Sequence, residues 1–159
     1  MLKTLRTKMQ DDKGFTLIEL MVVVLIIAIL IAIAIPTFLG LRRRAQDRAA
    51  QSDLRNGLTA AKAFYTDDES YTNFDAAQGE LIEPSLNWNV AADPDFVTIE
   101  VALDDQIVLQ RTSASGTVFC IADAAVDPDG AGALQAGTVG RTGGGATFAT
   151  CAAAPQWLG

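Results

Sequence analysis

Glu19 is the one charged residue between positions 15 and 41, and it stands directly before an unbroken apolar run, residues 20–35. The run contains sixteen apolar residues, so it needs a membrane or an equally dry protein bundle around it. A carboxylate beside such a run is costly unless a cation neutralises it, because an unpaired charge is strongly disfavoured away from water. The chemistry that these residues predict is therefore charge pairing with a partner.

Three aspartates in the C-terminal half are weak candidates for a metal site: Asp123, Asp127 and Asp129. They offer the oxygens that Ca²⁺ prefers, but their spacing is not that of an EF-hand, and residues 127–130 (Asp-Pro-Asp-Gly) are an ordinary turn signal. The chain has no histidine and no convincing pair of nucleophile and base. We therefore expect no cofactor and no enzymatic activity.

The apolar run is long enough to cross a bilayer. Residues 20–35 span roughly 24 Å as a helix, and the flanking apolar residues extend this to roughly 40 Å, against a hydrocarbon core of about 30 Å. Pro36 falls late in the run and should bend the helix without ending it. Basic residues flank the run on both sides, so charge does not decide its orientation.

The basic residues after the run are Arg42, Arg43, Arg44 and Arg48, and three interpretations of them stay open. They contact anionic lipid head groups, form a solvated face, or pair with acids of a neighbouring subunit. Beyond residue 62 the chain has two basic residues and fourteen acidic ones, which makes direct nucleic-acid binding by that part improbable.

Residues 41–67 continue as an amphipathic helix, because Leu54, Leu58, Ala61 and Tyr65 form one stripe. Gly57 is a soft spot in this helix. Alternating apolar residues then predict strands at 97–103, 107–109 and 117–121, joined as an antiparallel meander that covers the stripe. Residues 70–95 and 127–146 are expected to be loops, and 147–151 a last short strand. The predicted fold is an α+β headpiece on a long N-terminal helix.

Cys120 and Cys151 are the two cysteines of the chain, and an even number in a polar segment favours a disulfide. Such a bond would stabilise the fold by about 3–4 kcal/mol in the entropic account and would close a C-terminal loop. It would place the headpiece in an oxidising compartment outside the cytoplasm. The alternative is two unrelated free thiols.

Residues 13–24, Lys-Gly-Phe-Thr-Leu-Ile-Glu-Leu-Met-Val-Val-Val, resemble the processing site of type IV prepilins. The resemblance covers about thirty residues: a basic leader, Gly14, Phe15, a carboxylate four residues later and a long apolar run with a late proline. It implies that residues 1–14 are a leader peptide and that a prepilin peptidase cuts between Gly14 and Phe15 and then methylates Phe15. Residues 15–41 would be the membrane and fibre-core helix, and residues 42–159 the pilin head.

The resemblance also implies an assembly role for Glu19, which would pair with the Phe15 amine of a neighbouring subunit in a homo-oligomeric helical filament. The expected partners are the peptidase and methyltransferase, the pilus assembly machinery and further copies of the chain. The subunit would be a single-pass inner-membrane protein before assembly and part of a surface fibre afterwards, serving adhesion, motility or DNA uptake. Related pilins often carry a glycine where this chain has Ala28, which leaves open whether the helix unwinds there.

Two alternatives remain at this stage. A pseudopilin of a type II secretion-like system would share the same N-terminal features. More remotely, the chain would be a secreted soluble binding domain behind an ordinary signal peptide, with residues 32–34 (Ala-Ile-Ala) as the cleavage site.

Overall fold

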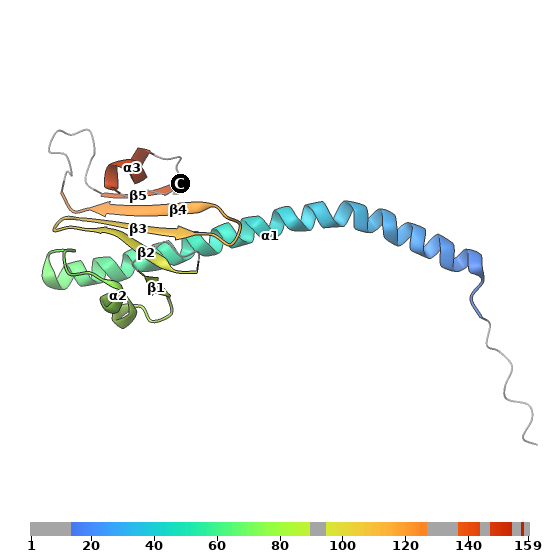
Figure 1. Cartoon of the computed structure of the whole chain (residues 1–159), viewed down its shortest axis with the longest axis horizontal. Helices are drawn as coiled ribbons and strands as arrows, with labels where there is room; N and C mark the ends of the chain where they lie inside the picture. The colour runs from blue at the N-terminus through green and yellow to red at the C-terminus, as the bar shows by residue number, and fades with distance from the viewer. Residues whose placement is uncertain (1–13, 90–94, 127–136, 144–146, 154–156, 158–159) are drawn as a thin grey trace, which may run out of the picture. The chain divides into compact units, whose positions relative to one another are not determined.

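The computed structural model describes residues 14–89, 95–126, 137–143, 147–153 and 157 (Figure 1). It divides into two compact units, Met1–Leu41 and Arg42–Gly159. The N-terminal helix α1 (Leu17–Asp68) contributes to both of them.

In the first unit, the part of α1 up to residue 41 exposes all of its side chains. The helix passes through Pro36 without ending, as the sequence predicts. One residue further on, the Thr37 hydroxyl donates a hydrogen bond of 2.9 Å to the Ile33 carbonyl. Ala28 lies inside the same continuous helix.

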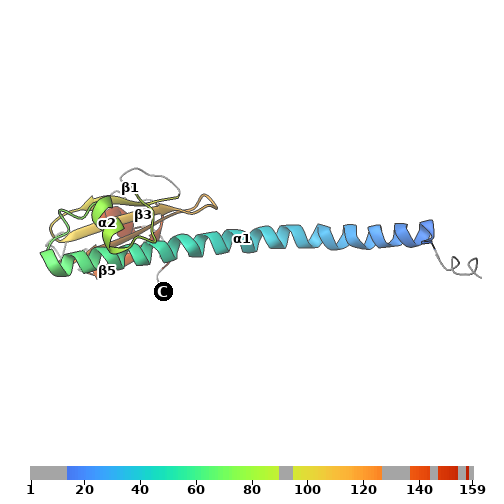
Figure 2. The same ribbon diagram turned by 90° about the horizontal axis from the view of Figure 1, so that it is seen from below.

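In the second unit, α1 runs along the sheet (Figure 2), and its predicted stripe is buried there. Leu54, Leu58 and Ala61 are buried and Tyr65 is half-buried. A Cβ added to Gly57 would lie 3.3 Å from side-chain atoms of both Leu109 and Trp88. The glycine that weakens the helix locally therefore marks a place where the helix approaches the sheet closely.

The predicted three-stranded meander is present as β2 (Val97–Ala102), β3 (Gln106–Thr112) and β4 (Val118–Ala124). Two further strands extend it into a sheet of order β1-β2-β3-β4-β5. β1 (Trp88–Asn89) runs parallel to β2, and β5 (Gly137–Thr142) runs antiparallel to β4. The four strands β2–β5 form the antiparallel part of the sheet.

The two faces of the sheet bury different clusters because side chains alternate along a strand. Ile107 and Leu109 face α1, together with Phe119 and Ile121 of the neighbouring strand. Val108 lies in the opposite cluster with residues that include Cys120, Ala122 and Cys151. Figure 1 shows α3 (Phe148–Ala153) beside β4 and β5, away from α1. The headpiece is thus a sheet with a long helix on one face and a short one on the other.

Three predictions for the headpiece were wrong. Residues 70–95, expected to be a loop, contain α2 (Ala76–Ile82) and β1. The Asp75 carboxylate starts α2 by accepting from the Gln78 N–H. Residues 127–146 contain β5. Residues 148–151 belong to α3 instead of a strand, because Thr147 caps that helix by accepting from the Thr150 N–H and alanines favour helix.

Candidate assembly site at the start of the long helix

Thr16 and Glu19 form a reciprocal pair of hydrogen bonds at the start of α1. The Thr16 N–H donates to Oε2 of Glu19 at 2.8 Å, and the Glu19 N–H donates to Oγ1 of Thr16 at 3.3 Å. The Thr16 hydroxyl donates to the same Oε2 at 2.7 Å. This arrangement is a capping box, which satisfies two backbone N–H groups that the helix itself leaves unpaired. It fixes Leu17 as the first helical residue and leaves residues 14–16 outside the helix.

Sequence reasoning singled out Glu19 but missed Thr16. The signal was present, because Thr-x-x-Glu directly before an apolar run is the sequence signature of a capping box. The structure therefore gives Glu19 neutral donors within its own chain. Both side-chain bonds use Oε2, so the second oxygen, Oε1, can accept from another donor.

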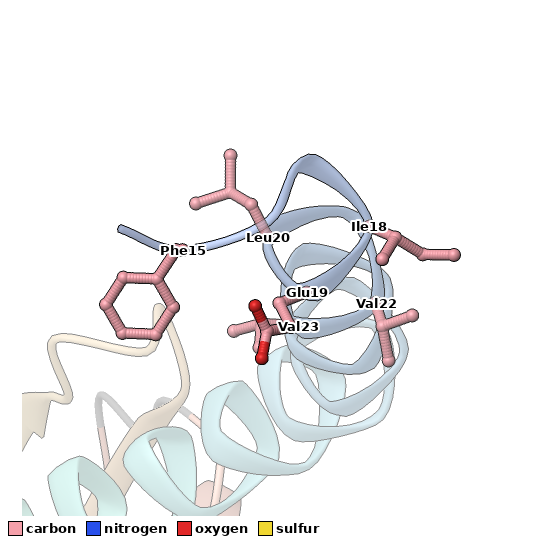
Figure 3. Close-up of a pocket in the computed structure, with 6 residues that line it drawn as sticks. All are labelled: Phe15, Ile18, Glu19, Leu20, Val22 and Val23. Carbon is pink, nitrogen blue, oxygen red and sulfur yellow. The ribbon is translucent and has the colours of Figure 1, made fainter. Parts of the chain in front are cut away.

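The Glu19 carboxylate lies in an apolar setting at the helix start. Phe15, Ile18, Leu20, Val22 and Val23 line a hollow around it (Figure 3). Phe15 exposes 88% of its surface, and the apolar residues that follow it are also exposed. Once such a surface is covered by lipid or protein, a cation beside the carboxylate would be attracted far more strongly than in water. Chemically, the site is suited to recognising a single positive group.

Helix α1 is long and apolar enough to cross a membrane. Its residues before Arg42 make no buried contact within the described chain. A helix that is apolar all round requires an apolar environment on every side. Lipid and a bundle of like helices both provide one.

Asp123, the first of the weak metal candidates, lies on β4 and is bound by groups of the chain itself. The Lys62 ammonium lies 2.8 Å from its Oδ1, and the Tyr71 hydroxyl donates to its Oδ2 at 3.0 Å. The Thr138 hydroxyl of β5 donates to it as well. Within the described residues, no group of three or more potential ligands could hold a metal ion. Asp127 and Asp129 lie outside the described residues.

Burial, and then the adjacent Asp123 carboxylate, raises the pKa of Tyr71 well above its ordinary value. Tyr71 is almost completely buried, so its ionised form would lose water and face a negative charge. The pair ties the segment after α1 to the centre of the sheet. Asp123 therefore has a structural explanation that needs no metal.

Cys120 and Cys151 form the predicted disulfide, with their Cα atoms 6.0 Å apart. It joins β4 to α3 on the sheet face opposite α1. The two tryptophans pack within the headpiece. Trp88 is buried edge-on against Phe74, and Trp157 donates to the Cys120 carbonyl.

Comparison with known proteins bears on the N-terminal segment. The family described as "Prokaryotic N-terminal methylation motif" matches residues 9–35, which include the capping box and the whole apolar run. Residues of the chain are also 46% identical over 63 positions to the type IV major pilin protein PilA of Myxococcus xanthus. These findings support the expected resemblance of the chain to type IV pilins. The matched methylation motif thus includes the residues that line the hollow around Glu19.

In some relatives the similarity covers about half of this chain. The type IV wide pilus major component PilA4 of Thermus thermophilus is 44% identical over 82 residues, which cover 52% of this chain and 63% of the relative. The type II secretion system core protein G of Vibrio cholerae is 32% identical over 80 residues, covering 50% and 55%. The Myxococcus match covers 40% of this chain and 29% of that pilin. The chain thus spans less than two thirds of these relatives. No solved structure matches.

Proposed function

We propose that the chain is a structural subunit of a type IV pilus, polymerised through its N-terminal helix. The observation that carries the proposal is a single carboxylate, that of Glu19, at the start of an exposed apolar helix. Thr16 binds its Oε2, and its Oε1 can accept a further hydrogen bond. The pilin relatives support a structural role. We accordingly propose no enzymatic activity.

Processing would create the cation that this carboxylate lacks. A prepilin peptidase cutting between Gly14 and Phe15 turns the Phe15 amide nitrogen into an α-amine. Such an amine has a pKa of about 8, so it is largely cationic at neutral pH, and methylation leaves it basic. Cleavage therefore changes the helix start from an anionic site alone into one that carries an anion and a cation.

In the fibre, the Phe15 amine of one subunit would bind Oε1 of Glu19 in the next. Thr16 would keep the carboxylate oriented by holding Oε2. Before assembly, the same two donors lower the cost of placing the carboxylate at a membrane surface. The pair would define the axial register between subunits, the best-attested role of a buried charge pair.

The proposed organisation assigns residues 1–14 to the leader, 15–41 to the membrane and fibre-core helix, and 42–159 to the head. The subunit would wait in the inner membrane and then join a surface filament with the help of an assembly machine. Its partners would be further copies of itself, the peptidase and methyltransferase, and that machine.

A pseudopilin of a type II secretion system is the second candidate, because two matches are core proteins G of such systems. Both are 32% identical, below the 44% and 46% of the pilins. Expression in a host that lacks its own pilins separates the two. Long surface fibres support a pilus, whereas secretion without long fibres supports a pseudopilus.

The test of the assembly site uses Glu19→Gln and Glu19→Ala in the full chain. Glutamine can still close the capping box but carries no charge, so it isolates charge pairing from helix capping. For the unmodified chain, we expect mass spectrometry to show N-methylated Phe15. For Glu19→Gln, we expect the yield of sheared filaments to fall about tenfold or more, while the amount of subunit in the membrane stays normal. Filaments of unmodified yield and subunit spacing from Glu19→Gln would contradict the pairing.

A further inference from the structure

Four arginines form an exposed group at the start of the headpiece. This base cluster comprises Arg42, Arg43, Arg44 and Arg48, all on α1 and all within the second unit. The ion pairs that the structure shows among its described residues join Lys62 to Asp123 and Arg111 to Asp53. The base cluster is therefore available to an external anionic partner.

An acidic group lies at the other end of the same helical segment. This acidic tip comprises Asp67, Asp68, Glu69 and Asp104, all of them exposed. The Tyr71 N–H donates to the Asp104 carbonyl at 3.1 Å, which brings the turn between β2 and β3 next to the end of α1. Its four carboxylates come from two segments that the fold brings together.

The local structure around the acidic tip does not favour acids. The last turn of α1 carries no basic residue, and negative charge at a helix C-terminus opposes the helix dipole. Glu69 also has a φ of 52°, a conformation that glycine adopts at far lower cost. These acids therefore have no explanation in the stability of their own helix, whereas a cationic partner would explain them.

The two clusters are separated by a fixed distance along one helix. Positions 44 and 68 are 24 residues apart, or about 36 Å at 1.5 Å per residue. Two copies lying side by side in register would place arginines against arginines and acids against acids. A copy shifted along the helix axis by about 36 Å would place the base cluster of one against the acidic tip of the other.

We infer that the base cluster of one copy binds the acidic tip of a second copy, displaced along the fibre axis. This inference rests on the proposed pilus function and adds a second contact, between heads, to the contact at Glu19. Each exposed pair is weak, but the contact repeats in every subunit, so its effect on the whole filament is multiplied. The charge pattern also disfavours in-register association, in which like charges would meet.

Charge reversal tests the contact in the full chain. Converting Arg42, Arg43 and Arg44 to Glu, or Asp67, Asp68 and Glu69 to Lys, should each lower sheared filament yield by about tenfold, since like charges then meet. Combining both sets in one chain should restore most of the yield. N-terminal mass spectrometry should show unchanged processing in all of them. Failure of the combined variant to assemble would overturn the inference.

The combined variant also restores the net charge of the chain, so its recovery alone does not prove a direct contact. Chemical cross-linking separates the two explanations. Arg44→Lys keeps the positive charge and supplies an amine that a carbodiimide can join directly to a carboxylate. Within one copy, position 44 lies about 36 Å from position 68, so such a link must join two copies. In mapped peptides from filaments of this variant, we expect the introduced amine at position 44 to be joined to Asp67, Asp68 or Glu69.

The outcomes also separate this inference from the pilus function. Filaments that form normally without any such link overturn the head contact alone. Absence of filaments and of methylated Phe15 from the unmodified chain removes the pilus proposal itself. Filament yield that stays normal in the arginine-reversed variant, while its binding to vesicles with anionic phospholipid is lost, would assign the base cluster to lipid and overturn the head contact.

Discussion

Replacing Asp123 by alanine should destabilise the headpiece by about 1–3 kcal/mol, because it leaves the buried Tyr71 hydroxyl without its acceptor. The Tyr71 hydroxyl, on a residue that is 1% exposed, would lose the Asp123 carboxylate that lies 3.0 Å away. The Lys62 side chain is 47% exposed and can turn to water, so its ion pair contributes little to this figure. For a domain of this size, the loss corresponds to a fall in Tm of about 10 °C.

Thermal unfolding of the full chain in detergent, followed by near-ultraviolet circular dichroism, measures this change, since Trp88 and Trp157 both lie in the headpiece. Asp123→Asn should fall in between because its amide oxygen can still accept from Tyr71. Asp68→Ala removes an exposed acid of equal charge and should change Tm by less than about 2 °C. If Asp123→Ala and Asp68→Ala gave the same Tm, the Asp123 network would not stabilise the headpiece.

Three further predictions concern the same headpiece. The raised pKa of Tyr71 means that above about pH 10 the unfolded chain loses a proton that the folded chain keeps. Stability should therefore fall with rising pH there by at most about 1.4 kcal/mol per unit, and Tyr71→Phe should flatten that part of a denaturation profile. Gly79→Ala should lower the free energy of unfolding by about 1–3 kcal/mol, and with it Tm, because the new Cβ would lie 2.5 Å from Cδ2 of Trp88. A raised Tm would show that the ring moves freely. Glu69→Gly should stabilise the chain against chemical denaturation by about 1 kcal/mol more than Glu69→Ala does, and equal effects would refute the cost of its backbone conformation.

The sequence predicted those elements whose apolar pattern repeats over several turns or strand residues. The stripe of α1 and the three central strands were found in this way, because Leu54 and Leu58 or Val97 and Ile99 recur at the period of their element. β5 contains two glycines and two threonines, and its position depends on pairing with β4, which local pattern does not reveal. α2 and α3 have seven and six residues, too few to show a period.

The candidate site divides in the same manner. Glu19 and the residues before it were evident from local spacing, and Thr16 was within reach of the same reasoning. The partners of Asp123 come from α1, from the segment after it and from β5, so no local pattern identifies them. The interpretation of Asp123 as a metal candidate considered its sequence neighbours, whereas the fold supplies an ammonium and two hydroxyls instead.

In the proposed processing reaction, the capping box would also affect how the peptidase binds the chain. Proteases bind their substrates as extended chain, and a peptide bond inside a helix would first have to be unwound. Because Thr16 stops the helix at Leu17, the bond between Gly14 and Phe15 stays outside it, and an added side-chain atom at Gly14 would meet nothing within 4 Å. If the peptidase cuts there, as we propose, the carboxylate that we expect to join subunits after cleavage would also keep this bond open to the enzyme beforehand.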